Sequence, residues 1–194
     1  MDSNAWDERY GASDLVWSAG PNLFLPPLVE DLKPGTALDL ACGEGRNAIW
    51  LASNGWAVMA VDYSPVGIEK ARRLAGDTHV QWVVGDVTTW TSEDRFDLVV
   101  IFYLHLPPDE FAAVIRSAIG MLAAGGTIFG VGHAVRNVTD GYGGPPYPEI
   151  LWSEDRIEPL LAGLNVIELG ERTRYVEDAD ATAIDVVFQA QRSG

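Results

Sequence analysis

The sequence predicts an α/β fold in which a doubly wound, mostly parallel sheet of seven strands carries helices on both faces. Short apolar runs of strand length alternate with amphipathic segments of helical period along the chain. The first run leads into a glycine turn at Gly43 and Gly45, and the second ends in an acid, Asp62. Together these observations indicate a parallel sheet with a ligand site at the carboxyl ends of its strands.

Length and composition favour one domain over residues 1–194, because 194 residues with 47 % hydrophobic content can bury one substantial core. No apolar run approaches the roughly 20 residues of a membrane span, and the first residues lack a basic leader, so we expect a cytoplasmic protein without membrane contacts. The formal charge of −15 repels phosphate backbones and argues against nucleic-acid partners. Cys42 is the single cysteine, and no Cys/His cluster has the spacing of a metal site, so no metal is expected.

Residues 1–35 are expected to form an aromatic lid followed by a helix. Four apolar residues have helical spacing, and Lys33-Pro34-Gly35 closes the helix. They are Leu23, Phe24, Leu28 and Leu32. Three aromatic residues precede them and either fasten the N-terminus to the core or cover a bound sulfonium, which an aromatic face attracts. They are Trp6, Tyr10 and Trp17.

Strands are predicted over 36–41 and 56–62, with a helix between them that stops at Asn54-Gly55. The glycines of the intervening turn let the backbone approach a ligand closely, and Asp62 can accept hydrogen bonds from both ribose hydroxyls. The order of strand, glycine turn, helix, strand and acid therefore predicts a nucleoside site.

The glycines alone do not choose between a nicotinamide cofactor and S-adenosylmethionine, because Gly43-x-Gly45-x-x-Ala48 also fits the dinucleotide fingerprint. Asp39, however, lies inside the first strand, where a dinucleotide fold has an apolar residue. Glu44 and Arg46 place charges where a pyrophosphate needs bare amides, and these charges suit a ligand with an ammonium, a carboxylate and a sulfonium. An NAD(P)-dependent oxidoreductase and a non-catalytic S-adenosylmethionine-binding protein stay as alternatives.

The run Asp-Leu-Ala-Cys-Gly-Glu-Gly-Arg-Asn over residues 39–47 resembles motif I of class I S-adenosylmethionine-dependent methyltransferases. The continuation through residues 51–58 and Asp62 is similar to the tellurite-resistance and thiopurine methyltransferase branch. The resemblance implies a Rossmann-like sheet whose last strand is antiparallel, S-adenosylmethionine as cofactor, and methyl transfer as the activity. The residues expected to bind the cofactor are Trp6, Tyr10, Trp17, Asp39, Ala41, Cys42, Gly43, Gly45, Arg46, Asp62, Tyr63, Ser64, Asp86, Val87 and Phe102.

The rest of the chain continues the alternation. Ser64 is expected to cap a helix that carries Val66, Ile68, Ala71 and Leu74 on its apolar face and ends at Gly76. Asp86 follows the third strand, where it either accepts from an adenine amino group or caps a turn. Further strands are predicted over 79–84, 96–102, 127–132, 165–175 and 181–190, further helices over 109–121 and 153–161, and a turn over 122–126.

His105 and His133 follow the fourth and fifth strands, near the expected position of the methyl group, and either is a candidate general base or a structural histidine. Arg46 is the third candidate: it pairs with the donor carboxylate or an acceptor anion, or forms a surface salt bridge. Cys42 is interpreted as a small apolar filler rather than a nucleophile.

Residues 134–152 contain Gly-Tyr-Gly-Gly-Pro-Pro-Tyr-Pro without helical or strand period, and are predicted to be a loop that covers the substrate; a variable surface loop is the alternative. The Asn/Asp-Pro-Pro-Tyr/Phe motif of nucleic-acid amino-methyltransferases is absent after the fourth strand. We therefore expect a small acceptor such as a thiol, a chalcogen oxyanion or a small hydroxylated aromatic.

Overall fold

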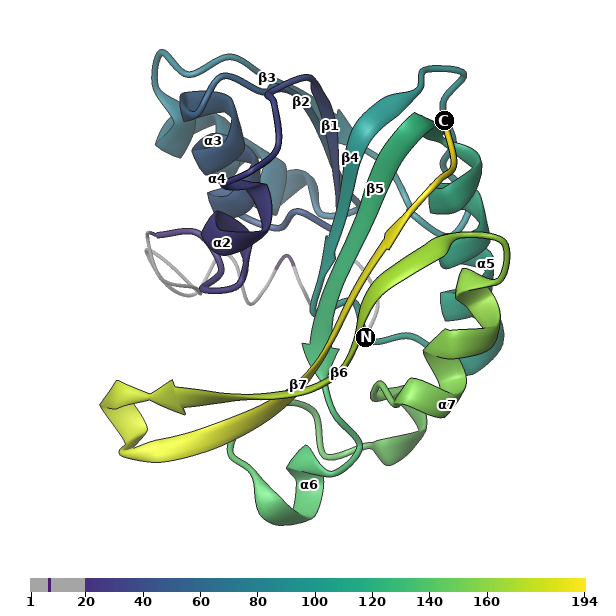
Figure 1. Cartoon of the computed structure of the whole chain (residues 1–194). Helices are drawn as coiled ribbons and strands as arrows, with labels where there is room; N and C mark the ends of the chain where they lie inside the picture. Colours follow the sequence, from purple (N-terminus) through teal and green to yellow (C-terminus); the bar gives the residue numbers. More distant parts are fainter. Residues whose placement is uncertain (1–6, 8–19) are drawn as a thin grey trace.

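The computed structural model describes residue 7 and residues 20–194, which form a twisted sheet with helices on both faces (Figure 1). The strands are β1 (Thr36–Leu40), β2 (Ala57–Asp62), β3 (Val80–Val84), β4 (Phe96–Phe102), β5 (Leu122–His133), β6 (Asn165–Val176) and β7 (Ala181–Gln191). The helices are α2 (Leu25–Val29), α3 (Arg46–Ser53), α4 (Pro65–Ala75), α5 (Pro108–Gly120), α6 (Asn137–Asp140) and α7 (Glu154–Ile157). Short 3₁₀ turns are η1 (Pro148–Ile150), η2 (Glu158–Leu161) and η3 (Glu177–Ala179).

The seven strands lie in the order β3-β2-β1-β4-β5-β7-β6. The pairs from β3 through β5 are parallel, whereas β7 is antiparallel to both of its neighbours, β5 and β6. This confirms the predicted fold class and the antiparallel last strand. The chain order reverses between β1 and β4, and open α/β sheets bind ligands at the carboxyl ends of the strands beside such a reversal.

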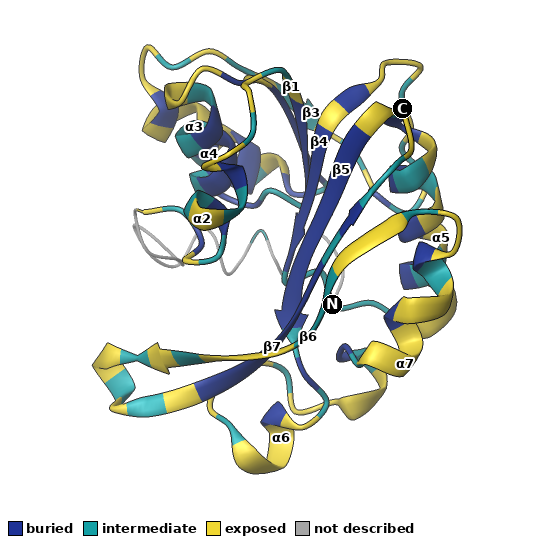
Figure 2. Cartoon of the chain, viewed as in Figure 1, coloured by how far each residue is buried: buried dark blue, intermediate teal, exposed yellow. Residues whose placement is uncertain are grey.

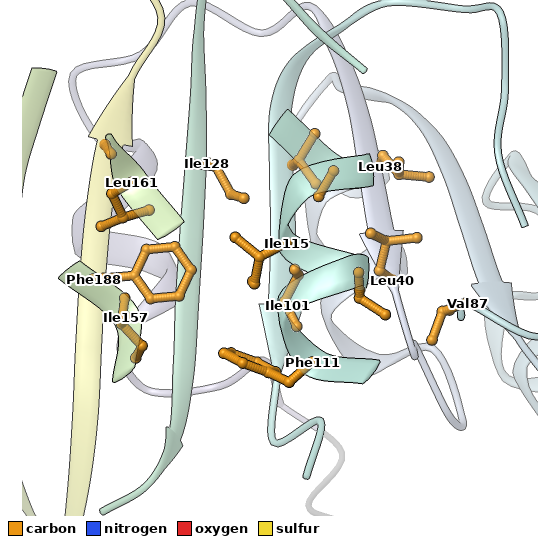
Figure 3. Close-up of a cluster of buried hydrophobic side chains, with 14 of the residues drawn as sticks. Leu38, Leu40, Val87, Ile101, Phe111, Ile115, Ile128, Ile157, Leu161 and Phe188 are labelled. Carbon is orange, nitrogen blue, oxygen red and sulfur yellow. The ribbon is translucent and has the colours of Figure 1, made fainter. Parts of the chain in front are cut away.

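Helices α2, α3 and α4 cover one face of the sheet, and α5 and α7 cover the other (Figure 1). The middle strands are buried along most of their length (Figure 2). Figure 3 shows the core under α5 and α7, where Leu40, Ile101 and Ile128 of three strands meet Ile115 of α5. A second cluster under α2 and α3 includes Leu51. Each of these side chains contributes roughly 1.5–3 kcal/mol through burial.

The helix predicted over 22–32 is shorter in the structure, where α2 begins only at Leu25. Pro26 and Pro27 lack the N–H groups that a longer helix would need to bond the carbonyls four residues earlier. The buried side chains are Leu25 and Val29. Of the predicted apolar residues, Phe24, Leu28 and Leu32 are partly buried against the same cluster, whereas Leu23 is 67 % exposed.

Two other boundaries differ from the prediction. Leu122 already pairs with Phe96, and the register then shifts, so the predicted turn over 122–126 is an irregular start of β5. The predicted helix over 153–161 divides into α7 and η2, because Pro159 cannot donate an intrahelical hydrogen bond. Ser64 Oγ accepts from the Gly67 N–H as predicted, but Leu74 of that helix is 48 % exposed.

No helix among residue 7 and residues 20–194 is long and apolar enough to cross a membrane.

Candidate active site at the carboxyl ends of the strands

The turn between β1 and α3 is built from residues with positive φ angles: Ala41 (60°), Gly43 (56°) and Gly45 (78°). Gly45 is required for a second reason, since a Cβ there would lie 2.4 Å from the ring of Trp82. Helix α3 begins directly after Gly45, so its first N–H groups face the turn, an arrangement that suits polar or anionic ligand groups.

Asp62 at the end of β2 fastens this turn to the sheet. Its Oδ2 accepts from the Gly43 N–H at 2.8 Å and its Oδ1 from the Ser64 N–H at 2.9 Å. Burial raises the pKa of the Asp62 carboxyl, and these two N–H groups partly offset the rise. A carboxylate offers about four acceptor positions, so Asp62 keeps capacity for two ribose hydroxyls while it holds the turn.

Asp39 lies inside β1 behind the turn and is 1 % exposed. Its Oδ2 has no hydrogen-bond partner among the described residues. Burial, and then the charge of Asp62, raise the pKa of the Asp39 carboxyl to about 8, while the Ala48 N–H and the charge of Arg46 act in the opposite direction. An unsatisfied buried oxygen is costly, and a cationic ligand group would satisfy it.

Arg46, the first residue of α3, is half-buried. Burial lowers the pKa of its guanidinium, and the charged or polar groups that act on it include Tyr103, Asp39, Arg174 and Glu44. These groups belong to β1, the glycine turn, the end of β4 and β6, and the pairing of Arg46 with the donor carboxylate or an acceptor anion stays a prediction.

The remaining predicted cofactor residues have different environments. Cys42 is in the turn, where burial and the nearby carboxylates of Asp39 and Asp62 raise the pKa of its thiol, in agreement with a filler role. Tyr63 follows Asp62, and Val87 is buried in the core. Phe102 is also buried, with its ring centroid 5.8 Å from that of Phe129.

Asp86 is exposed and closes a turn after β3, where its Oδ1 accepts from Thr88 N at 2.9 Å and from Thr88 Oγ1 at 2.8 Å. The preceding Gly85 donates its N–H to the Asp62 carbonyl at 2.9 Å, so Asp86 lies at the same edge as Asp62. The structure thus has the turn-capping contact, and the contact to adenine stays a prediction.

The two candidate histidines are brought together. Their rings are stacked, with centroids 5.4 Å apart and an angle of 9° between planes, and His133 N donates to His105 Nε2 at 3.1 Å. Burial, and then the neighbouring His133, lower the pKa of His105 to about 3. The ring of Tyr103 lies 4.9 Å from that of His133.

Sequence reasoning missed Arg174 and Asp185 of this cluster, and it indicated Tyr103 only as part of the turn to His105 that shapes the pocket. Asp185 on β7 is fully buried, and its Oδ2 accepts from Tyr103 Oη and Arg174 Nε, each at 3.0 Å. Its Oδ1 lies 3.0 Å from His133 Nδ1. One sequence feature could have indicated Asp185: it is the single charged residue in the run from Ala181 to Ala190, just as Asp39 is the single charged residue in the apolar run of β1.

A model of the methyltransferase domain family matches residues 37–126, which include the turn, Asp39, Asp62 and Asp86. The chain is an S-adenosylmethionine-dependent methyltransferase. This confirms the resemblance to the tellurite-resistance and thiopurine branch, the enzyme class and the cofactor, and it disfavours the oxidoreductase alternative.

Among its relatives, thiocyanate methyltransferase 1 of Arabidopsis thaliana is 26 % identical over 186 residues, which cover 91 % of this chain and 80 % of that protein. Nodulation protein S of Rhizobium tropici is 33 % identical over 136 residues, 67 % of this chain and 52 % of that protein. The fold is also that of the N-methyltransferase NodS from Bradyrhizobium japonicum WM9, solved with S-adenosyl-L-homocysteine, with a TM-score of 0.79 at 18 % identity and full coverage of both chains.

In this methyltransferase, residues 134–152 are not a plain loop, since they include α6 and η1. Asn137 fixes the segment, because its Oδ1 accepts from the Ile184 N–H at 2.7 Å and its Nδ2 donates to the Gly143 carbonyl at 2.8 Å. Trp152 closes it with a hydrogen bond from Nε1 to the Leu104 carbonyl at 3.0 Å. A Cβ at Gly144 would lie 2.5 Å from the ring of His133, so the segment touches the histidine cluster.

Trp6, Tyr10 and Trp17 lie outside the described residues, and their role stays a prediction. Asp7 is described, and its carboxylate accepts from the Ser64 hydroxyl beside Asp62.

A surface groove of about 950 Å³ lies at the opposite, amino-terminal ends of the strands, lined among others by Thr36, His79 and Arg95. It contains none of the predicted site residues. We place the active site of the methyltransferase at the carboxyl ends, because ligands of open parallel sheets bind there and because the unsatisfied oxygen of Asp39 lies there.

Proposed function

We propose that this methyltransferase moves a methyl group from S-adenosylmethionine to a small acceptor, namely a thiol, a chalcogen oxyanion or a small hydroxylated aromatic. One observation carries the proposal: β1, which leads into the glycine turn, pairs in parallel with β4, which leads into Tyr103 and His105, so that Leu40 lies opposite Ile101. The proposed nucleoside site therefore lies next to the cluster of titratable groups around His105 and His133.

The donor fits the residues of the turn. The ammonium of the donor would satisfy the buried oxygen of Asp39, and its ribose hydroxyls would bind Asp62. The donor would lie directly against the backbone of Gly43 and Gly45. Asp86 is proposed to accept from the adenine amino group. When bound, the cofactor supplies a methyl group activated by a sulfonium.

The chain's own contribution is alignment and the exclusion of water, because methyl transfer is an in-line displacement. Residues 134–152 are proposed to cover the acceptor, since they contact His133 through Gly144. A base is needed only when the acceptor arrives protonated, and then an imidazole of the histidine cluster is the group in place.

The size of the acceptor is argued from charge and from the relatives. A formal charge of −15 offers no counterion-releasing surface for a nucleic acid. The relative named as a thiocyanate methyltransferase supports a small, soft nucleophile. A cytoplasmic location is part of the proposal, and a single unpaired cysteine, Cys42, is compatible with a reducing compartment.

A coupled assay for S-adenosylhomocysteine release tests the proposal. The full chain is incubated with the donor and, in turn, a small thiol, a phenol, selenite, iodide and thiocyanate. We expect turnover with at least one of them and none with RNA, DNA or an intact protein. Efficient methylation of a macromolecule, with no turnover of any small acceptor, would contradict the proposal.

A further inference from the structure

We propose that Asp185 is the positioning residue of a histidine–carboxylate pair in which His133, through Nε2, takes the proton of an acceptor that arrives as a thiol or a hydroxyl. In this assignment His105 is a neutral hydrogen-bond donor and not the base. The inference rests on the proposed function, since it concerns the second substrate of the same site.

The hydrogen bond between the histidines fixes the state of His105. Its Nε2 accepts from the backbone N–H of His133 at 3.1 Å, so Nε2 carries no proton and its lone pair is already used. The pKa of about 3, lowered by burial and then by His133, keeps this ring neutral over the physiological range. The proton of His105 is therefore on Nδ1, from which the ring can donate but cannot accept.

The state of His133 follows from two buried atoms that face each other. His133 Nδ1 and Asp185 Oδ1 lie 3.0 Å apart, not in the straight alignment of an ideal hydrogen bond, and neither has another hydrogen-bond partner among residues 7 and 20–194. A carboxylate only accepts, so the proton that satisfies both atoms is on Nδ1. The lone pair of His133 is then on Nε2, on the other side of the ring.

The surroundings hold Asp185 in this role. Burial alone raises the pKa of its carboxyl, but His133 and Arg174 bring the pKa below its ordinary value. The other oxygen is fixed by Tyr103 and Arg174, and β7 places Asp185 directly opposite His133 of β5. The titratable and charged groups around the pair are thus Tyr103 and His105 from the end of β4, Arg174 from β6, and Arg46 from α3.

The segment that covers the cluster packs its backbone at Gly144 against the Cδ2–Nε2 edge of the His133 ring. A Cβ at Gly144 would lie 3.0 Å from His133 Nε2 and 2.5 Å from its Cδ2, so glycine is required at this position. A larger residue at 144 would displace either the segment or the ring. The His133 side chain stays 13 % exposed beside this contact, and we infer that a small acceptor reaches Nε2 from that exposed part.

The proton transfer balances as follows. The sulfur or oxygen of the acceptor forms a bond to the methyl carbon, and its proton passes to His133 Nε2. The electron pair of the broken carbon–sulfur bond stays on the donor sulfur, which becomes a neutral thioether. Asp185 stabilises the imidazolium, and the extra proton is released to water after turnover.

The first test needs no substrate. Nitrogen NMR of the full chain labelled with ¹⁵N-histidine distinguishes the protonated ring nitrogen of each of the three histidines, His79, His105 and His133. At neutral pH we expect His105 and His133 to carry the proton on Nδ1, and we expect Asp185→Asn to change the spectrum of His133 but not of His79. A wild-type His133 with its proton on Nε2 overturns the inference, whatever the fate of the proposed function.

The second test compares acceptors. At pH 7, Asp185→Asn should lower kcat about 100-fold with a phenol, which is protonated, and less than about threefold with a benzenethiol that is already ionised. KM for the donor should change little, and the loss with the phenol should shrink as the pH approaches the phenol's own ionisation range. A purely structural role would lower both activities equally, and that result overturns the inference.

Asp97→Asn is the matched control, since Asp97 is an exposed, hydrogen-bonded aspartate at the other end of the sheet. The activity of this variant should stay within about twofold of that of the wild type. Turnover only of acceptors that are already ionised also overturns the inference but leaves the proposed function standing. If Asp185→Asn does not fold, the inference is tested by the wild-type spectrum alone, which shows whether the His133 proton is on Nδ1 or on Nε2.

Discussion

Asp39→Asn is expected to raise the melting temperature of the ligand-free protein while it lowers the affinity for S-adenosylhomocysteine about 100-fold. Asp39 is a buried carboxyl whose Oδ2 has no partner among the described residues. The asparagine keeps the shape of the side chain but cannot ionise when the donor's ammonium binds. The donor's ammonium then loses a charge-assisted hydrogen bond worth roughly 1.5–3 kcal/mol, together with the attraction between the two charges.

The sign of the pH dependence follows from the raised pKa of Asp39. Between about 4 and about 8 the folded protein holds a proton on Asp39 that the unfolded chain has lost, because the pKa rises from 3.8 to about 8. The contribution of Asp39 to the free energy of unfolding is therefore fully present below the pKa of the unfolded chain, 3.8, and is lost as the pH rises toward 8. Asp39→Asn avoids the loss, so its gain in melting temperature should be larger at pH 8.5 than at pH 6.

Calorimetric titration and thermal melts at the two pH values check this prediction. A gain of about 1–3 kcal/mol corresponds to several degrees for a chain of this size. Asp97→Asn, at the other end of β1 and β4, serves as the control and should change neither the affinity nor the pH dependence. An unchanged affinity for S-adenosylhomocysteine would remove Asp39 from the donor site.

Asp62→Ala should weaken binding of S-adenosylhomocysteine by at least about 30-fold, since two charge-assisted hydrogen bonds to ribose hydroxyls contribute roughly 2–4 kcal/mol together. The structure adds a second reason for a large effect. The same carboxylate accepts from the N–H groups of Gly43 and Ser64, so its loss also frees the glycine turn.

The two contributions can be separated. Asp62→Asn keeps one acceptor oxygen, so it should hold the turn better than alanine does and bind more tightly than Asp62→Ala. Asp94→Ala, at an exposed loop position, is the control and should bind as the wild type does. Calorimetry that finds Asp62→Ala within about threefold of the wild type would contradict the assigned role.

The donor half of the site could be predicted because its signals are local in sequence. Gly43, Gly45 and Asp62 lie within one strand–turn–helix–strand unit, and an acid inside an apolar strand, Asp39, directly indicates a buried carboxyl group. The seven strands followed from apolar runs in the same way. The apolar periodicity predicts longer helices than α2 and the two short helices between Ser153 and Leu161, because Pro26, Pro27 and Pro159 interrupt the helical hydrogen bonds.

The acceptor half depends on contacts between distant parts of the chain. Asp185 meets His133 only because β7 returns antiparallel beside β5, and Arg174 reaches the same carboxylate from β6. No spacing rule connects positions 103, 133 and 185. The sequence therefore indicated two equivalent histidines, and the packing of the strands distinguishes His105 from His133.

The central claim is that the carboxyl ends of β1 and β2 bind the nucleoside of a methyl donor. Its most direct test is a calorimetric titration of the full chain with S-adenosylhomocysteine and, separately, with NADH. We expect saturable, stoichiometric heat with S-adenosylhomocysteine and none with NADH. Binding of NADH without binding of S-adenosylhomocysteine would contradict the claim.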